Sequence, residues 1–267
     1  VAPDAPASAD LAVIFLPRAK AQARDMLAHA AEITTGTLVV DGAKTDGIDS
    51  IFKEMRKRGD ASAALSKAHG KLFTIPADTD LSDWRATPQT VEGGYQTAPG
   101  VFSADGVDPA SYLLGAALPA KLGSRVVDLG AGWGYLSAHI LGNEKVTTLD
   151  LVEADHAALD CARQNIPDPR ARFHWADATT WAGDAKYDTV VMNPPFHTTR
   201  SAEPDLGRAF IASAARLLTP SGSLWMVANR HLAYEATLNE VFAQVTEIGG
   251  DNRFKIFHAA RPSRQRR

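Results

Sequence analysis

The sequence predicts an α/β fold whose larger, second domain contains a seven-stranded sheet with helices on both faces. Strand-like and helix-like runs alternate along the chain, which is typical of parallel strands joined by helices. A glycine-rich turn at residues 130–134 connects one strand-like run to a helix-like run. The last two strand-like runs flank Gly249-Gly250-Asp251-Asn252, which indicates a closing antiparallel hairpin.

The first part of the chain predicts a smaller α/β domain. Residues 11–16, 37–40 and 72–75 are apolar and strand-like, and residues 19–33 and 48–58 have helical spacing. This set has no glycine-rich turn, so it is either a degenerate copy of the second domain or a small unrelated α/β cap. Residues 78–94 contain several Pro, Gly and Thr and predict a linker. We therefore predict domains at residues 1–80 and 99–267, with a linker at residues 81–98.

The second domain is predicted in more detail. Asp108 is positioned to cap a helix over residues 109–118. Five strand-like runs follow, starting near Arg125, Val146, Ala171, Tyr187 and Ser223, with helices between them around Tyr135, His156, Leu206 and His231. Residues 244–248 and 254–258 then form the hairpin. Right-handed crossovers between the five parallel strands, together with the hairpin, give seven strands.

Composition and charge exclude several classes of protein. The single cysteine, Cys161, excludes an internal disulfide. No uncharged apolar run approaches the ~20 residues that span a bilayer, and the first residues lack a secretory signal, so we expect a cytoplasmic protein. The net charge of −3 argues against a uniformly basic nucleic-acid surface. Basic residues do cluster locally, at Lys53, Arg56, Lys57 and Arg58 and in the tail at Arg261, Arg264, Arg266 and Arg267.

The glycine-rich turn reads Asp128-Leu129-Gly130-Ala131-Gly132-Trp133-Gly134. Alternate glycines allow positive φ angles and a close approach of the backbone to a ligand. The nicotinamide pattern G-x-G-x-x-G fits poorly, because Tyr135 stands where its third glycine would be. The order Asp-x-Gly-x-Gly-x-Gly after a strand instead resembles the S-adenosylmethionine (SAM) loop of class I methyltransferases.

Two further acids follow the next strand-like runs. Glu153 ends the second run, roughly 20 residues beyond the loop, where a carboxylate can bind ribose hydroxyls. Asp177 ends the third and is placed to bond an adenine amine. Each acid alone is better explained by a surface position or a helix cap. Their repetition at successive strand ends supports a binding site, because open α/β sheets bind ligands at that edge.

The segment Asn193-Pro194-Pro195-Phe196-His197 follows the fourth strand-like run. Two prolines prevent helix continuation, so the Asn193 side chain and the Pro194 carbonyl are presented together at the strand's end. Both oxygens can accept hydrogens from one amino group, while Phe196 offers a face for stacking a flat ring. An ordinary strand-ending turn is the structural alternative.

Four segments together resemble the RsmC-like family of bacterial ribosomal RNA guanine-N2 methyltransferases. They are Pro-Gly-Val-Phe-Ser-Ala-Asp-Gly-Val-Asp at 99–108, the glycine turn, Asn-Pro-Pro-Phe-His at 193–197, and Asn-Arg-Phe-Lys-Ile-Phe at 252–257. The resemblance is strong from about Pro99 to the C-terminus and weak before it. Three positions depart from the family: Trp133 is usually small, Asp177 is often Asn, and Ala110 is often Gly.

The resemblance implies SAM as cofactor, a class I methyltransferase sheet, and methylation of the exocyclic N2 amine of a guanine in ribosomal RNA, in the small subunit. Asn-Pro-Pro-Phe is also found in enzymes that methylate adenine or protein glutamine, so those substrates and a small-molecule amine remain alternatives. His197 and the Gly-Val-Phe-Ser lead-in favour guanine. We also expect a monomer, no metal and no membrane association.

The implied site residues fall into three groups. The expected catalytic residues are Asn193, Pro194 and Phe196. The expected cofactor contacts are Phe102, Asp128, Gly130, Ala131, Gly132, Gly134, Glu153, Asp177, Ala178 and Asn193. The expected substrate contacts are Pro195, Phe196, His197, Arg253 and Lys255, with His197 interpreted as a packing or phosphate contact in preference to a general base.

Overall fold

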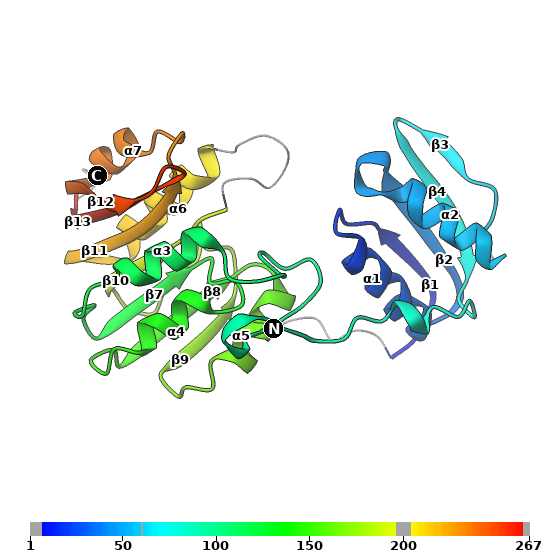
Figure 1. Ribbon diagram of the computed structural model, residues 1–267, viewed down its shortest axis with the longest axis horizontal. Helices are drawn as coiled ribbons and strands as arrows, with labels where there is room; N and C mark the ends of the chain where they lie inside the picture. The colour runs from blue at the N-terminus through cyan, green and yellow to red at the C-terminus, as the bar shows by residue number, and fades with distance from the viewer. Residues whose placement is uncertain (1–6, 60, 196–203, 264–267) are drawn as a thin grey trace. The chain divides into compact units, whose positions relative to one another are not determined.

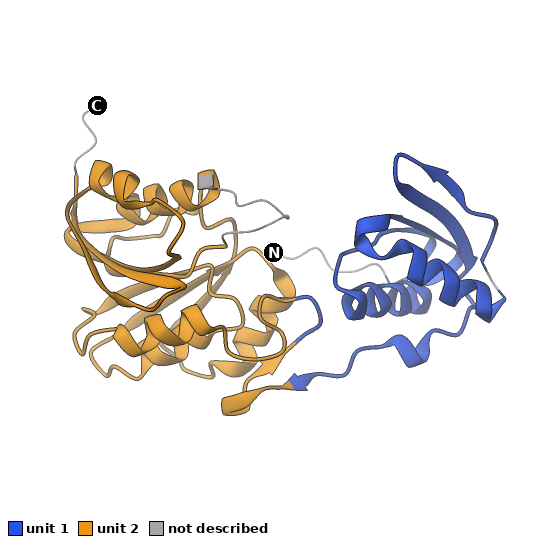
Figure 2. Ribbon diagram, turned by 45° about the horizontal axis from the view of Figure 1, so that its top comes forward, with its two compact units in different colours: residues 1–89, 98–100 blue, residues 90–97, 101–267 orange. Residues whose placement is uncertain are grey.

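The structure is a computed structural model that describes residues 7–59, 61–195 and 204–263. The chain divides into two compact units, which we describe separately (Figure 2). Unit 1 comprises residues 1–89 and 98–100, and unit 2 comprises residues 90–97 and 101–267.

Unit 1 contains a four-stranded sheet in the order β1-β2-β4-β3. Its elements are β1 (Ala9–Phe15), α1 (Lys20–Ile33), β2 (Thr34–Ala43), η1 (Lys44–Asp46), α2 (Ile48–Arg58), β3 (Leu65–Lys67), β4 (Gly70–Pro76) and η2 (Ser82–Trp84). Strands β1 and β2 are parallel, and the other pairs are antiparallel. The helices α1 and α2 bury their apolar faces against this sheet, with Leu27 and Met55 fully enclosed.

The first unit contains more structure than the sequence predicts. Strand β3 was not expected, because its three residues are all exposed and carry no apolar alternation. Leu81 and Trp84, which lie in the predicted linker, are buried in the core of unit 1. Beyond unit 1, the short strands β5 (Gln89–Thr90) and β6 (Gln96–Thr97) pair with each other around η3 (Glu92–Gly94), and residues 90–97 belong to unit 2. The likeness of this unit to a degenerate methyltransferase half stays a prediction.

Unit 2 contains the predicted seven-stranded sheet, in the order β12-β13-β11-β10-β7-β8-β9 (Figure 1). Its elements are α3 (Pro109–Ala117), β7 (Arg125–Leu129), α4 (Tyr135–Leu141), β8 (Thr148–Glu153), α5 (His156–Asn165), β9 (Ala171–Trp175), β10 (Tyr187–Met192), α6 (Pro204–Leu217), β11 (Leu218–Asn229), α7 (Glu235–Val241), β12 (Phe242–Gly250) and β13 (Phe254–Pro262). Strands β7 to β11 are parallel, and β13 runs antiparallel to both β11 and β12. The predicted fold class is confirmed.

Two apolar cores lie on the two faces of this sheet. One joins the sheet to α6 and α7, through residues such as Phe210 and Leu238. The other joins it to α3, α4 and α5, through residues such as Leu114 and Ile140. The central strands are covered on both sides, and β7, β8 and β10 are almost continuously buried. This rigid centre positions the loops at the carboxyl ends of β7, β8 and β10.

Several element boundaries differ from the sequence prediction, and the starts of β11 and α7 are among the larger differences. Strand β11 starts at Leu218, five residues before the predicted Ser223, because Leu218 pairs with Tyr187 of β10 across an irregular register. Helix α7 starts at Glu235 and not near His231, since residues 230–232 form a turn after β11. Among the described residues, no helix is long and apolar enough to cross a membrane.

Candidate active site

The glycine loop connects β7 to α4 at the carboxyl edge of the sheet. Gly130, Gly132 and Gly134 all have positive φ angles, of 74°, 54° and 97°. The amides of Gly130 and Ala131 donate to the carbonyl of Val152 in β8, at 2.9 and 3.2 Å. A Cβ atom added at Gly132 would meet no atom within 4 Å, so the loop leaves open space beside its own backbone. The arrangement suits a ligand that lies directly on the peptide.

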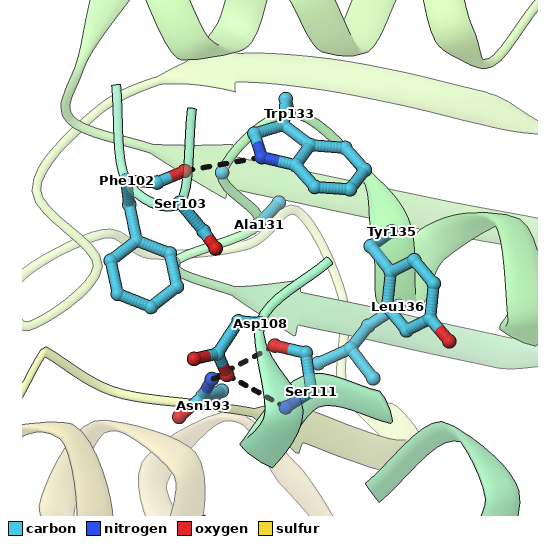
Figure 3. A pocket seen from close by; sticks show the side chains of 11 residues that line it. Phe102, Ser103, Asp108, Ser111, Ala131, Trp133, Tyr135, Leu136 and Asn193 are labelled. Atoms are coloured by element: carbon cyan, nitrogen blue, oxygen red, sulfur yellow. Dashed lines mark hydrogen bonds between the residues drawn. The ribbon is translucent and has the colours of Figure 1, made fainter. Parts of the chain in front are cut away.

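A pocket opens over this loop, between β7, the start of α3 and the end of β10 (Figure 3). Figure 3 shows the side chains of Phe102 and Asn193 bordering the same cavity as the glycine loop. The lining residues are Phe102, Ser103, Asp108, Ser111, Gly130, Ala131, Gly132, Trp133, Tyr135, Leu136 and Asn193. The pocket thus joins three of the segments that the sequence singled out, although they are far apart in the chain.

Asn193 is held in a defined orientation at the end of β10. Its Nδ2 atom donates to Oδ2 of Asp108 at 2.9 Å and to Oγ of Ser111 at 2.8 Å. The same Asp108 carboxylate caps α3 by accepting from the Ser111 amide at 2.8 Å. Because both amide hydrogens of Asn193 are used, its Oδ1 atom is left as the acceptor that can serve a ligand.

Trp133 closes the loop against the preceding segment. Its indole Nε1 donates to the Phe102 carbonyl at 3.1 Å, and the ring packs against Tyr95 and Tyr135 with centroids 5.2 and 6.0 Å apart. The Asn165 amide of α5 donates to the Trp133 carbonyl at 2.8 Å. Trp133, one of the three departures from the family pattern, is therefore buried, with 4% of its surface exposed, and its indole holds Phe102 beside the pocket.

Asp128, just before the loop, is fully buried. Its Oδ2 atom accepts from the Ser137 hydroxyl at 2.7 Å, while Oδ1 has no partner among the described residues. Burial raises the pKa of Asp128 to about 7, and the nearby Glu153 carboxylate adds to the rise, against the Ser137 hydrogen bond. A cation bound at the loop would favour the ionised form of this carboxyl.

Comparison with known proteins decides the family. Residues 92–258 match the family model of the methyltransferase small domain. The chain is 30% identical over 261 residues to the ribosomal RNA small subunit methyltransferase C of Shewanella oneidensis, a match that covers 92% of this chain and 75% of that protein. The chain belongs to the methyltransferase small-domain family.

Two further relatives are consistent with this family assignment. The Vibrio cholerae protein of the same name is 28% identical over 264 residues, which covers 94% of this chain and 77% of that one. Among solved structures, the T. thermophilus 16S rRNA N2 methyltransferase (RsmC), in complex with AdoMet and guanosine, superposes with a TM-score of 0.79 at 28% identity. That match covers 96% of this chain and 74% of the other.

In this methyltransferase, the two predicted acids occupy different settings. Glu153, at the end of β8, accepts from the Gly132 amide at 2.8 Å through Oε2 and from the Asp155 amide at 2.8 Å through Oε1. It therefore lies directly beside the loop. Asp177 is exposed beyond β9 and accepts from the amide and hydroxyl of Thr179, at 2.8 and 2.7 Å. Asp177 and its buried neighbour Ala178 do not line the pocket described above.

The predicted substrate contacts are placed unevenly. Arg253 lies in the exposed β12–β13 turn, with 61% of its side chain exposed. Lys255 is only 4% exposed, and its ammonium lies 2.5 Å from the Glu235 carboxylate. Lys255 thus already has an anionic partner, which favours a structural role over a phosphate contact. Pro194 is buried and Pro195 half-buried after β10, whereas Phe196 and His197 lie outside the described residues.

Five lining residues were not predicted as site residues: Ser103, Ser111, Trp133, Tyr135 and Leu136. Asp108 was predicted as a helix cap and not as a site residue. One sequence signal could have identified Ser111 as a site residue. Ser111 lies one turn after an N-cap acid, and that acid follows the Gly-Val-Phe-Ser lead-in. Among the described residues, no group of three or more His, Cys, Asp and Glu side chains is arranged to hold a metal ion.

Proposed function

We propose that this protein transfers a methyl group from SAM to the exocyclic N2 amine of a guanine in small-subunit ribosomal RNA. The observation that carries the proposal is the fixed Asn193 amide, which presents an acceptor oxygen to the pocket that the glycine loop borders. The names of the most similar proteins and the AdoMet and guanosine in the related structure support the choice of cofactor and base.

The residues present fit SAM. Gly132 leaves room for a ligand against the loop backbone, and Glu153 stands beside that loop as an acceptor for ribose hydroxyls. Phe102, held by Trp133, borders the same cavity. When bound, SAM supplies a sulfonium methyl that is already electrophilic, so the transfer has no chemical need for a metal or a covalent nucleophile.

The main task of the protein is to orient the amine. Asn193 Oδ1 and the Pro194 carbonyl each accept one hydrogen of the guanine amine, so that its nitrogen lone pair faces the methyl group. The nitrogen–carbon bond forms as the carbon–sulfur bond breaks, and the extra proton then passes to water. Alignment of this kind is worth up to ~7–11 kcal/mol in the most favourable cases. The guanine has to leave its stack to enter, which costs a few kcal/mol.

The decisive experiment is nucleoside mass spectrometry of ribosomal RNA from cells that lack the protein. We expect one N2-methylguanosine to disappear from small-subunit RNA and to return with the wild-type gene but not with Asn193→Ala. Loss of N6-methyladenosine in its place, or labelling of protein only, would refute the guanine assignment. A ribosomal RNA substrate also favours a cytoplasmic location, and we propose that the enzyme acts as a monomer.

A further inference from the structure

We propose that the outer face of α2 in unit 1 binds the phosphate backbone of the RNA substrate. This face, defined by Lys53, Arg56 and Lys57, is here called the α2 basic face. The inference rests on the proposed function, since it assumes an RNA substrate. It assigns a task to the unit that lacks the glycine loop.

The geometry of α2 places the three side chains together. Ile48, Ile51 and Met55 are buried against the sheet of unit 1. Lys53, Arg56 and Lys57 are all exposed. Residues three and four positions apart are neighbours on a helix surface, with Cβ atoms about 5–6 Å apart. The three cations therefore form one continuous stripe.

The acids of the same helix already have other partners. The Glu54 carboxylate lies 2.6 Å from both Lys20 and Arg24 of α1. Asp49 pairs with Lys71 of β4. Within the described residues no carboxylate pairs with the α2 basic face, and the Arg56 guanidinium lies over the Phe52 ring, 6.0 Å from its centroid. Three neighbouring positive charges are thus left uncompensated.

In contrast to the α2 basic face, most arginines of unit 2 already have a partner. Arg170 pairs with Asp168 at 2.7 Å, Arg172 with Asp150 at 2.6 Å, and Arg230 with Glu247 at 3.0 Å. Since the whole chain carries a net charge of −3, attraction to RNA has to come from local groups of free cations. The α2 basic face is such a group on a rigid element.

The test compares the full-length wild type with the triple variant Lys53→Gln, Arg56→Gln and Lys57→Gln, whose net charge becomes −6 from −3. Glutamine retains helix propensity, so the fold should persist. The probe is unmodified small-subunit rRNA transcribed in vitro, and equilibrium binding is measured directly over a range of salt concentrations. We expect binding at low salt to weaken about tenfold or more, and the slope of log K against log salt to become shallower by about 2.

A matched control removes three exposed cations of unit 2. They lie at the edge of its sheet opposite the glycine loop. Lys121→Gln, Lys145→Gln and Arg261→Gln together also give a net charge of −6 from −3. These residues precede β7 and β8 or lie near the end of β13, away from the carboxyl edge that carries the glycine loop. For this control, we expect the slope of log K against log salt to stay within about 0.5 of the wild-type slope, which is about half the effect of one phosphate contact.

Equal slopes for the two variants would overturn the proposal. So would weakened binding to purified small subunits without weakened binding to free rRNA, since that would assign the face to a ribosomal protein. Unchanged SAM affinity of the α2 variant, with normal thermal unfolding, would separate an RNA contact from a purely structural role at the helix end. Because binding is read directly, the result is independent of which base is methylated.

Discussion

At the scale of single residues, Asn193 is the side chain on which the proposed chemistry depends. Its amide is held by Asp108 and Ser111 and does not take part in the glycine loop. Asn193→Ala should therefore keep SAM affinity and lower kcat about a hundredfold, because misplacement of a reacting group costs about that much. Calorimetry with SAM and single-turnover assays on rRNA would measure the two effects separately.

Asn143→Ala is the matched control for this change. The Asn143 amide also donates to a neighbouring segment, to the Ala120 carbonyl at 2.8 Å, but at the edge of the sheet away from the loop. Its kcat should stay near the wild-type value. An Asn193→Ala enzyme that methylated rRNA at a normal rate would remove this residue from the mechanism.

Trp133 should act on cofactor binding and not on the transfer itself. Its indole positions Phe102 through one hydrogen bond of 3.1 Å. Trp133→Phe keeps a large ring but deletes the donor, so KM for SAM should rise about three- to tenfold, as expected for ~0.5–1.5 kcal/mol, with kcat within about twofold. Steady-state kinetics at saturating rRNA would give both constants.

The control for this variant is Trp225→Phe. Trp225 lies in β11, where its ring packs at a tilt against His258 with centroids 4.6 Å apart, and it does not line the pocket. Its substitution should leave KM for SAM unchanged. A lower kcat at constant KM in Trp133→Phe would contradict the positioning role.

At the scale of elements, three strands are joined by one buried carboxylate. Asp150 in β8 accepts from Arg172 and His174 of β9, each at 2.6 Å, and from the Tyr187 hydroxyl of β10 at 2.9 Å. Burial alone would raise the pKa of Asp150, but the bonds from His174, Arg172 and Tyr187 outweigh burial and hold it below its usual value.

Asp150→Asn should lower the free energy of unfolding by about 2 kcal/mol, because it removes a buried charge from its donors. Since the pKa is lower in the folded state, this contribution is complete above the normal range of an aspartate and is lost only as pH falls through the lowered pKa. Urea unfolding should therefore give the same difference from wild type at pH 5.5 and at pH 7.

Asp184→Asn offers a comparison within the same network. Asp184 also bonds Arg172, at 3.0 Å, but its side chain is 65% exposed. Exposed pairs contribute about 0–1 kcal/mol, so this change should have little effect. If both substitutions lowered the free energy of unfolding equally, burial would not explain the contribution of Asp150 to stability.

At the scale of the whole molecule, the features expected to bind SAM all lie in one of the two units. The turn that has alternate glycines and Glu153 beside it lies in unit 2, and the sequence of unit 1 has no such turn. Calorimetry should therefore give one SAM per chain. The double variant Gly132→Arg with Glu153→Ala should abolish binding, because a large side chain would fill the space at the loop and the ribose acceptor would be lost. Two equivalent sites, or binding that survives these changes, would be inconsistent with this division.

The sequence by itself determined the fold class and the edge of the sheet at which the glycine turn and Asn193 lie. The glycine turn, the Asn-Pro-Pro segment and the Gly-Gly hairpin are local patterns, and each constrains its own backbone whatever surrounds it. Because parallel strands bring their carboxyl ends to one edge, the order of strand and motif also places the loop and Asn193 at the same edge of the sheet.

Only the tertiary structure decided which side chains hold one another. Asn193 and Asp108 are 85 positions apart, and Trp133 and Phe102 are 31 apart. The burial of Lys255 against Glu235 and of Trp84 in unit 1 likewise depends on how separate elements pack. Such contacts follow from strand register and helix rotation, which the packing of all elements fixes jointly and no local pattern encodes.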